Sequence, residues 1–408
     1  MDSTEREGLR PKGNVPNLRF KEFEGEWEKC KLGDKCDLLC GYAFDGKNIV
    51  EQGTYLLMRG INITEGIIRH SSELDRYYTG SVNNLAKYKL TTGDLVIGMD
   101  GSKVGRNSAI VSLTENGSYL VQRVCRIKSC IGNDFLLQLV NNHKFHKYVD
   151  MVKTSSAIPH ISLKDIQNFP IAVPSIQKEA DKISRLFHLL DERIATQNKI
   201  IEDLKKLKSA IIEKHYSQVK KRTTCIADLG EPFSVGSLAK DDLTEIGSPC
   251  VIYGELFTTY GEIIFHIESC TNKTDGMILS KKGDLLFPSS TTVDAMSLIA
   301  PSVINVDGVV LGGDMFGIHI SHNYNAQYLS YYFNHIAKKQ LAKFAKGSTI
   351  IHLHYKDIEK AKLLLPSLEE QNRMAKCLVA LDKKVSVEQN LLSSLTCQKS
   401  YLLQQMFI

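Results

Sequence analysis

Two long stretches of the chain carry apolar residues at the spacing of an amphipathic helix and contain no proline or glycine. They cover residues 175–217 and 367–407. Each opens with a serine directly after a proline and has acidic residues in its first turns, which is typical of a helix N-terminus. At 1.5 Å per residue, either helix could extend about 60 Å. The pattern therefore predicts two unusually long helices.

A coiled-coil-like stripe runs along each predicted helix, and we expect its apolar residues to pack between the helices. The first stripe contains Leu190, Ile194, Ile201, Leu204 and Ile211. The second repeats the same steps with Leu381, Val385, Leu392, Leu395 and Leu402. Polar residues interrupt both stripes at matching positions, Gln197 with Glu388 and Lys208 with Lys399. The matched breaks favour helices that pack on each other, although length and stripe alone leave open two core helices of separate domains.

The segments that lead into the two long helices are copies of one another. Residues 156–160 (SAIPH), 163–166 (LKDI) and 173–176 (VPSI) recur at one constant offset as residues 348–352 (STIIH), 355–358 (YKDI) and 365–368 (LPSL). Further upstream, residues 93–96 (GDLV) match residues 283–286 (GDLL). The bodies of the two copies otherwise differ widely. The chain is therefore an internal duplication in which the frame repeats and the content varies.

Each copy has the pattern of a small α+β domain. Short β-rich runs punctuated by glycine come first, for example residues 94–99 and 308–311. A helical pattern follows over residues 134–149 in the first copy and 326–346 in the second. A loop with a histidine, a short strand and the long helix complete each copy. We expect residues 15–174 and 221–366 to be two tandem domains, residues 175–220 and 367–408 the long helices, and residues 1–14 a loose tail.

Composition and charge narrow the class of protein. Hydrophobic residues make up 43% of the 408 and charged residues 24%, which is ordinary for a globular protein and excludes a disordered or fibrous chain. The net charge of +5 permits a polyanion partner but argues for one only weakly. The longest apolar stretch, residues 298–320, is interrupted by Asp307 and Asp314. We therefore expect no membrane span and a cytosolic protein.

The ten cysteines give no sign of a metal site. They form no Cys-x-x-Cys pair, and the closest group, Cys30, Cys36 and Cys40, has spacings that no common zinc site uses. We expect buried thiols rather than disulfides or metal ligands.

The arrangement resembles the specificity subunit of type I restriction–modification systems over nearly the whole chain from Val15 onward. The likeness is carried by the opening segments at residues 15–20 (VPNLRF), 23–27 (FEGEW) and 31–34 (KLGD), by the glycine-marked runs at residues 93–96 and 283–286, and by the prolines that lead into each long helix. The second helix has Glu370 and Gln371 where the family has Glu-Gln, whereas the first has Lys178 and Glu179. We expect this departure to change only the helix cap.

The resemblance implies that each globular half is a target recognition domain that reads one part of a split double-stranded DNA site. It also implies that the two spacer helices form an antiparallel pair, which fixes the gap between the half-sites and docks two methyltransferase subunits. Nuclease-translocase subunits would join further out. The chain itself would be non-catalytic and would hold no cofactor or metal.

One motif is similar to a nucleotide site. Residues 41–47 (GYAFDGK) match Gly-x-x-x-x-Gly-Lys, the phosphate-cradling loop of nucleotide hydrolases. The next residue is Asn48, where a Ser or Thr hydroxyl must hold magnesium. No strong helix start follows to aim backbone amides at a phosphate. We therefore interpret the segment as a turn between strands.

The motifs of methyltransferases and magnesium nucleases are missing from the sequence. No Gly-x-Gly occurs among the 28 glycines, and the dipeptides Asn-Pro, Asp-Pro and Pro-Asp are absent. His352 and His354 alternate along an expected strand and could ligate a metal, but the first copy has His160 and Ser162 instead. A hydrogen-bonding or core role is favoured for these histidines, and likewise for His143 and His146.

Basic and hydroxyl side chains in loops are the candidate DNA contacts, because Lys and Arg meet phosphates and Arg can fork onto guanine. Lys103 and Arg106 lie in a Gly/Ser loop after a strand, Arg59 just past another strand, and Arg123 and Arg126 on opposite parities of a third. The loop before the shared histidine adds Lys153, Ser155, Ser156 and His160 in the first copy and Lys346, Ser348 and His352 in the second. The second copy has Ser289, Ser290 and Thr291 in place of Lys103 and Arg106. A different loop at a shared position is what two different half-sites require.

These observations favour a non-catalytic DNA-specificity subunit. The alternative class is an interaction scaffold whose helix pair joins proteins and has no DNA role. A self-contained restriction enzyme is disfavoured by the missing motifs.

Overall fold

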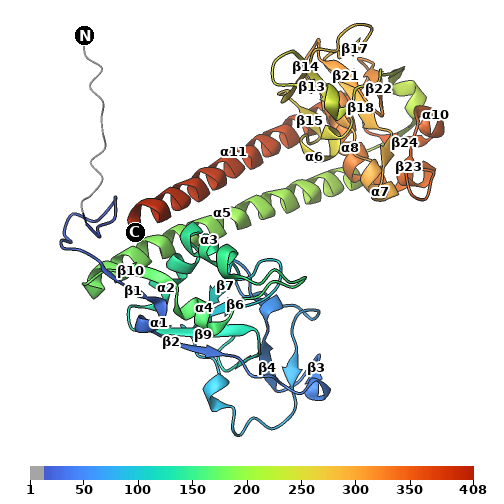
Figure 1. Cartoon of the computed structure of the whole chain (residues 1–408). Helices are drawn as coiled ribbons and strands as arrows, with labels where there is room; N and C mark the ends of the chain where they lie inside the picture. The colour runs from blue at the N-terminus through green and yellow to red at the C-terminus, as the bar shows by residue number, and fades with distance from the viewer. Residues whose placement is uncertain (1–12) are drawn as a thin grey trace, which may run out of the picture. The chain divides into compact units, whose positions relative to one another are not determined.

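The computed structural model describes residues 13–408, which form two compact units. The first unit contains the chain up to Gln197 together with Leu391–Ile408, and the second contains Asn198–Asn390. Both boundaries fall inside the long helices, so each unit consists of one β-rich domain and parts of both helices (Figure 1). Residues 1–12 of the expected tail lie outside the described residues. Within residues 13–408, no helix is both long and apolar enough to cross a membrane.

Both long helices are present and continuous. They are α5 (Gln177–Gln218) and α11 (Leu368–Met406). The expected cap is found in α11, where the backbone amide of Glu370 donates to the Ser367 hydroxyl at 3.4 Å. The same prediction is wrong for α5, because the Ser175 hydroxyl donates to the backbone oxygen of Glu26 at 2.9 Å instead. The serine of the first copy therefore fastens the opening segment of the chain.

The two helices contact each other in both units, and they run antiparallel. In the first unit Asp191 of α5 accepts from Lys399 of α11 at 2.5 Å. In the second unit Lys208 of α5 donates to Asp382 of α11 at 2.8 Å. The expectation of a packed helix pair is thus confirmed, and the alternative of two separate core helices is wrong.

The stripe residues are covered, as the pattern predicts. All ten apolar stripe residues are buried or half-buried, whereas most of the other positions on the helices between them are exposed. The polar breaks Gln197 and Glu388 are buried with them. Burial of one face along each helix is what a coiled-coil-like seam requires.

The first domain is built on two four-stranded sheets and one two-stranded ladder. One sheet has the order β2 (Cys36–Cys40), β9 (Val124–Ser129), β6 (Leu95–Gly98), β7 (Ser108–Ile110). The other has the order β3 (Ile49–Val50), β5 (Tyr77–Tyr78), β4 (Tyr55–Met58), β8 (Tyr119–Leu120). The ladder pairs β1 (Glu28–Lys31) with β10 (Pro170–Val173). The helices are α1 (Leu32–Lys35), α2 (Asn133–Val140), α3 (His143–Val152) and α4 (Leu163–Gln167), with short 3-10 turns η1 (Gly46–Asn48), η2 (Gly60–Asn62) and η3 (Ala86–Tyr88).

The second domain repeats this frame with longer sheets. One has the order β12 (Gly230–Ser234), β22 (Met315–Ile320), β18 (Asp284–Pro288), β20 (Ser302–Ile304), β15 (Ile263–Ile264). The other has the order β13 (Leu243–Thr244), β16 (Ser269–Thr271), β14 (Ser248–Ile252), β21 (Val310–Gly312), β17 (Ile278–Leu279). Two ladders pair β11 (Arg222–Cys225) with β24 (Lys362–Leu365) and β19 (Ser290–Thr291) with β23 (Ile351–His352). The helices are α6 (Glu255–Thr258), α7 (Ala295–Leu298), α8 (Ala326–His335), α9 (Lys338–Leu341) and α10 (Tyr355–Ile358), with turns η4 (Ile226–Leu229), η5 (Lys240–Asp242) and η6 (Ala342–Phe344).

The duplication seen in the sequence is also present in the strand pairing. The antiparallel run β2-β9-β6 corresponds to β12-β22-β18, and the parallel pair β4–β8 corresponds to β14–β21. The ladder β1–β10 corresponds to β11–β24. The expected α+β class with two tandem domains is therefore confirmed.

The expected single helices over residues 134–149 and 326–346 are each divided in the structure. The first is α2 followed by α3, because the Asn142 side chain accepts from the amide of Lys144 at 3.1 Å and starts a new helix. The second is α8, α9 and η6 in succession. The capping residue Asn142 indicated a new helix start, but the continuous apolar spacing on both sides of it favoured a single helix.

The ten cysteines all carry free thiols, as expected, but their burial differs from the expectation. Only Cys125 and Cys250 are buried, whereas Cys130, Cys377 and Cys397 are exposed. Burial raises the pKa of Cys36 to about 11. The Gly-x-x-x-x-Gly-Lys segment is confirmed as a turn between strands, since β2 precedes it, the three-residue η1 includes its last two residues, and β3 follows.

The departure at Glu179 has a larger effect than a changed cap, so that expectation is wrong. Glu179 is fully buried, and Arg19 donates to both of its carboxylate oxygens at 2.7 Å. The indole nitrogen of Trp27 donates to the same carboxylate at 3.3 Å. In the second copy Gln371 is also buried, but it bonds the amide of Asn325 and the oxygen of Pro366. The acid at this position therefore anchors the opening segment to α5.

The anchor predicts a clear difference between two variants. Arg19→Ala leaves the buried Glu179 carboxylate without its cation and should reduce the free energy of unfolding of the first unit by about 3 kcal/mol. Glu179→Gln keeps the volume and leaves no buried negative charge, so it should cost less. Chemical denaturation monitored at Trp27, which contacts the same carboxylate, measures both. Lys182→Ala removes an exposed ion pair from the same helix and is the control. Equal losses for Arg19→Ala and Lys182→Ala would contradict the anchor.

Candidate nucleic-acid interface

The two histidine loops are the same structure in both units. The amide of Thr154 donates to the oxygen of His160 at 3.0 Å, and the amide of Lys346 donates to the oxygen of His352 at 2.9 Å. In the first unit the Thr154 hydroxyl also lies 3.0 Å from Nδ1 of His160. Both histidines are half-buried. Each therefore closes a short exposed loop.

In the first unit the histidine loop is hydrogen-bonded to the segment that carries Lys103 and Arg106. The amide of Gly101 donates to the oxygen of Pro159, and the amide of Ile161 donates to the oxygen of Met99, both at 3.0 Å. The amide of Met99 in turn donates to the oxygen of Arg123 at 2.9 Å. We call the three segments together the first loop cluster: residues 99–106, 123 and 153–160. It brings together Lys103, Arg106, Arg123, Lys153, Ser155, Ser156 and His160.

The second unit has the corresponding connections, and we call the residues that they join the second loop cluster: residues 289–292, 314 and 346–352. The amide of Leu353 donates to the oxygen of Ser289, and the amide of Ser289 donates to the oxygen of Asp314, both at 2.8 Å. The cluster includes Thr291, Lys346, Ser348 and His352. Lys346 and Ser348 are exposed.

The expectation that Ser289, Ser290 and Thr291 lie in a loop is wrong for Ser290 and Thr291. Ser290–Thr291 is strand β19, and it pairs with β23 of the histidine loop. Ser289 and Ser290 are buried by this pairing, while Thr291 is half-buried. The segment joined to the histidine loop is thus a short strand in the second copy and a basic loop in the first.

Cations in both clusters, whether exposed or half-buried, are paired with nearby acids. Lys103 lies 3.2 Å from Glu65, and Lys346 lies 2.5 Å from Asp357. Asp150 is shared, at 2.8 Å from Arg106 and 2.7 Å from Lys153. Hydrogen bonds from Lys153, with the charge of Arg106, hold the pKa of Asp150 below its usual range. Exposed pairs of this kind contribute little to stability, so a phosphate can replace the acid.

Two of the candidate arginines are held away from an open surface. Arg126 is buried, and its guanidinium donates to the oxygen of Lys87 at 2.9 Å and to Asp37 at 3.3 Å. Arg59 is half-buried and donates to the oxygen of Leu74 at 3.4 Å. Arg126 therefore has a structural role, and Arg59 is only partly available.

Arg123 has a strained backbone. Its φ is +69°, and it is the one non-glycine residue among residues 13–408 with a positive φ. A left-handed conformation costs an ordinary residue about 1–2 kcal/mol. Such strain is often kept at functional positions. The exposed side chain of Arg123 is therefore a strong candidate among the predicted contacts.

The histidine pair differs from the expectation. His352 ends β23, whereas His354 lies just beyond it at the start of α10, so the two do not share one strand face. Their rings stack with centroids 6.1 Å apart. In the described part of the chain, no group of three or more His, Cys, Asp or Glu is placed to hold a metal ion.

Two exposed isoleucines were missed as candidates. Ile158 is 66% exposed and Ile350 is 49% exposed, and they occupy the same place in the two histidine loops. Apolar side chains can contact thymine methyl groups or wedge between base steps. The signal was available, because this isoleucine recurs in the duplicated motif of the sequence.

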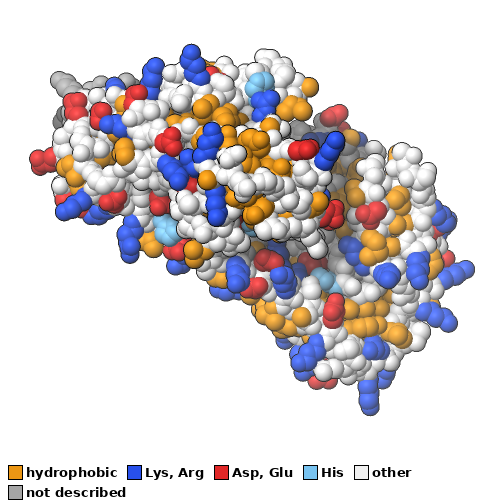
Figure 2. Space-filling model, turned by 90° about the horizontal axis from the view of Figure 1, so that it is seen from below, with side chains coloured by type: hydrophobic (Ala, Val, Ile, Leu, Met, Phe, Trp, Pro, Cys, Tyr) orange, Lys and Arg blue, Asp and Glu red, His pale blue; other side chains and the backbone are white. Residues whose placement is uncertain are grey.

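The surface carries no single basic stripe on the face in Figure 2, where Lys and Arg are interspersed with Asp, Glu and apolar side chains. This agrees with the mild net charge. On this face, a contact with DNA would therefore depend on particular loops rather than on a continuous basic surface.

The chain is similar to known specificity proteins. A family model described as the type I restriction modification DNA specificity domain matches it twice, over residues 24–206 and 225–396. The type I restriction enzyme EcoAI specificity subunit of Escherichia coli is 30% identical over 188 residues, which is 44% of this chain and 30% of that protein. The MjaVIII specificity subunit of Methanocaldococcus jannaschii is 24% identical over 258 residues, 57% of this chain and 60% of that protein. Each match covers less than two thirds of the relative's own length.

Solved structures share the fold. The S subunit of a type I restriction–modification system from M. genitalium has a TM-score of 0.63 at 16% identity and covers 97% of this chain and 99% of its own. A chain from a study of complex assembly and conformational transition of the type I system has a TM-score of 0.55 at 15% identity, covering 93% and 97%. Both likenesses extend over the two domains and the long helices.

Replacing Arg123 separates its strain from its side chain. Arg123→Gly relieves the left-handed backbone, whereas Arg123→Ala keeps it, so the glycine variant should be the more stable of the two by about 1 kcal/mol. Both variants lose the guanidinium and should bind duplex DNA more weakly by similar factors. Denaturation and binding measurements on the same preparations test this. Unchanged DNA affinity in both variants would remove Arg123 from the interface.

Removing Asp150 should strengthen DNA binding. Asp150→Asn frees Arg106 and Lys153 from their shared carboxylate, and each new phosphate contact should steepen the plot of log affinity against log salt by about one unit. Titration of an arbitrary duplex at several salt concentrations measures the slope. Glu51→Gln, at an exposed acid that is no part of the first loop cluster, is the control. The same slope in all three proteins would place the DNA face elsewhere.

Proposed function

The chain belongs to the family defined by the type I restriction modification DNA specificity domain, and from this premise we propose that it selects a split double-stranded DNA site for a type I restriction–modification complex. Each domain reads one half-site through its loop cluster. The observation that carries the proposal is a repeated frame with different content: the same histidine loop is joined to a basic loop in one unit and to a short serine-threonine ladder in the other. A shared frame orients each domain, and different side chains read different bases.

The candidate contacts differ in how well the geometry supports them. In the first domain the exposed members of the cluster are Lys103, Arg123, Ser155 and Ser156, with Arg106, Lys153 and His160 half-buried beside them. In the second they are Lys346 and Ser348, with Thr291 and His352 half-buried. Ile158 and Ile350 add an apolar contact to each. Ser289 and Ser290 support the β19–β23 ladder instead.

The helices hold the domains at a set distance and dock partner subunits. α5 and α11 each carry apolar residues outside the buried stripe, including Ile200, Leu207, Val387 and Leu391, which are exposed. Such positions offer contact surface to methyltransferase subunits, and two copies of the frame favour two of them. Nuclease-translocase subunits complete the complex, and catalysis belongs to these partners.

The rival function is a scaffold without a DNA role. It shares the helix pair but gives no reason for two loop clusters with a shared frame and different side chains. Selection of duplexes from a randomised library, with and without a methyltransferase partner, separates the two functions, because a scaffold enriches no sequence.

Exchange of one domain tests the modular reading of a split site. Residues 221–366 would be replaced by the corresponding domain of another member of the family. One half of the methylated sequence should change, and the other half and the gap should persist, because the first loop cluster and both helices are untouched. The matched control exchanges residues 15–174. A change in both halves from a single exchange would contradict independent reading.

A further inference from the structure

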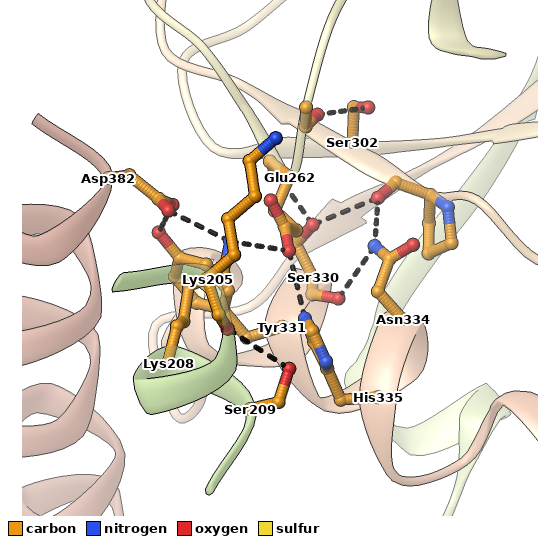
Figure 3. Close-up of polar contacts among 12 residues, drawn as sticks. Lys205, Lys208, Ser209, Glu262, Ser302, Ser330, Tyr331, Asn334, His335 and Asp382 are labelled. Carbon is orange, nitrogen blue, oxygen red and sulfur yellow. Dashed lines mark hydrogen bonds and ion pairs between the residues drawn. The ribbon is translucent and has the colours of Figure 1, made fainter. Parts of the chain in front are cut away.

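A lysine in the middle of the second unit joins three separate parts of the fold. Lys208 of α5 is only 12% exposed, and its ammonium lies 3.0 Å from Glu262 and 2.8 Å from Asp382. Glu262 directly precedes β15 of the recognition domain, whereas Asp382 belongs to α11. One side chain thus links both long helices to the domain (Figure 3).

The acid on the domain side is itself fixed by several bonds. Nε2 of His335, at the end of α8, lies 2.9 Å from the Glu262 carboxylate. The hydroxyl of Ser330 donates to the backbone oxygen of Glu262 at 2.7 Å, and the amide of Val303 donates to the same oxygen at 2.9 Å. Glu262 therefore cannot move without disturbing α8 and the neighbouring strand β20.

The acid on the helix side is tied to the same domain. The hydroxyl of Tyr331, a buried residue of α8, donates to Asp382 at 2.5 Å. The ring of Tyr331 also faces the Lys208 ammonium, 5.5 Å from its centroid. We call the group of residues joined by these contacts the junction network: Lys208, Glu262, Asp382, Tyr331 and His335.

The charges in this network favour their ionised forms. Burial alone would raise the pKa of Glu262, but hydrogen bonds from His335 and Lys208, with the charge of Lys208, lower it to about 2. Burial alone would lower the pKa of Lys208, but the two carboxylates raise it. Ionised partners make short, directional hydrogen bonds, whereas the apolar contacts around them have no preferred direction.

The first unit has a reduced form of the same arrangement. Asp191 and Lys399 are the duplicated counterparts of Asp382 and Lys208, and they pair at 2.5 Å. Gln138 of α2 donates to Asp191 at 3.4 Å. Within the described residues, Lys399 forms an ion pair with Asp191 alone. The second carboxylate is thus particular to the second domain.

We propose that Lys208 is a positioning residue, which fixes the second recognition domain on the helix pair and so sets how strictly the protein rejects a wrong gap between half-sites. The inference rests on the proposed function. Apolar contacts have no preferred direction, so alone they would leave the domain free to turn slightly on the helices. The junction network prevents this, because Lys208 binds the domain and both helices at once.

To reject a wrong gap, the protein must fix the position of its second loop cluster relative to the DNA. A duplex rises about 3.4 Å per base pair, so a protein that rejects a gap wrong by one base pair must hold its second loop cluster more closely than that. A small rotation of the second domain on the helices would displace its loop cluster. Lys208 lies where such a rotation would start.

The test uses the full chain in complex with its methyltransferase subunits. Duplexes would carry both half-sites at the correct gap, one base pair fewer and one base pair more, and kcat/KM for methyl transfer would be measured on each. Lys208→Met removes the charge and keeps the length of the side chain. It should raise the rate on wrong gaps relative to the correct gap by about tenfold, with the half-site sequences unchanged. Lys208→Arg keeps the charge and should restore the discrimination.

Further variants keep the test decisive. Lys206→Met removes a 69% exposed lysine of the same helix that pairs with Glu202, and it should leave discrimination unchanged. Tyr331→Phe and Glu262→Gln preserve side-chain shape and carry the test if Lys208→Met does not fold. Equal loss of activity on all three gaps, in every variant of the network, would overturn the inference. A wild-type complex that ignores the gap would instead overturn the proposed function.

Discussion

Each globular half of this protein completes its hydrophobic core with helices from both halves of the sequence. Phe407 follows the second domain in the chain, yet it packs in the first unit against Trp27, Phe135 and Phe187, with ring centroids 5.2 to 6.2 Å apart. In the second unit Ile212 of α5 shares a core with Met374 and Leu378 of α11. Burial of large aromatic side chains is among the strongest stabilising contributions available to a core. Neither unit is complete without both helices, and this requirement sets the antiparallel arrangement.

The duplication explains the electrostatics of the helix pair. Asp191 with Lys399 and Asp382 with Lys208 are the same two positions, since the duplication exchanges α5 and α11. An antiparallel pair of duplicated helices brings such positions together twice. The second copy has Glu262 and His335 in addition to this pair, whereas the first copy has the pair in simple form. The frame of the chain is thus shared, and the additions are local.

The elements that depend on local pattern could be predicted. The long helices follow from the absence of proline and glycine over about forty residues, and their pairing from matched polar breaks at Gln197 and Glu388. The predictions that failed concerned residues whose contact partners are distant in sequence. Ser175 bonds Glu26 rather than its own helix, and Glu179 receives Arg19 from 160 residues away. Ser290 and Thr291 have the composition of a loop, but pairing with β23 makes them a strand. In the candidate site, the sequence identified the exposed cations. The strain at Arg123 could be seen only from its backbone φ in the structure.

We propose that the helix pair sets the distance between two independent recognition domains. The most direct measurement is the methylated sequence of a protein with one heptad removed from each helix, residues 197–203 and 388–394. Each cut keeps the stripe aligned and shortens its helix by about 10 Å, which corresponds to about three base pairs. Both half-sequences should persist while the gap between them shrinks. An active double deletant that methylates at the original gap would contradict this proposal.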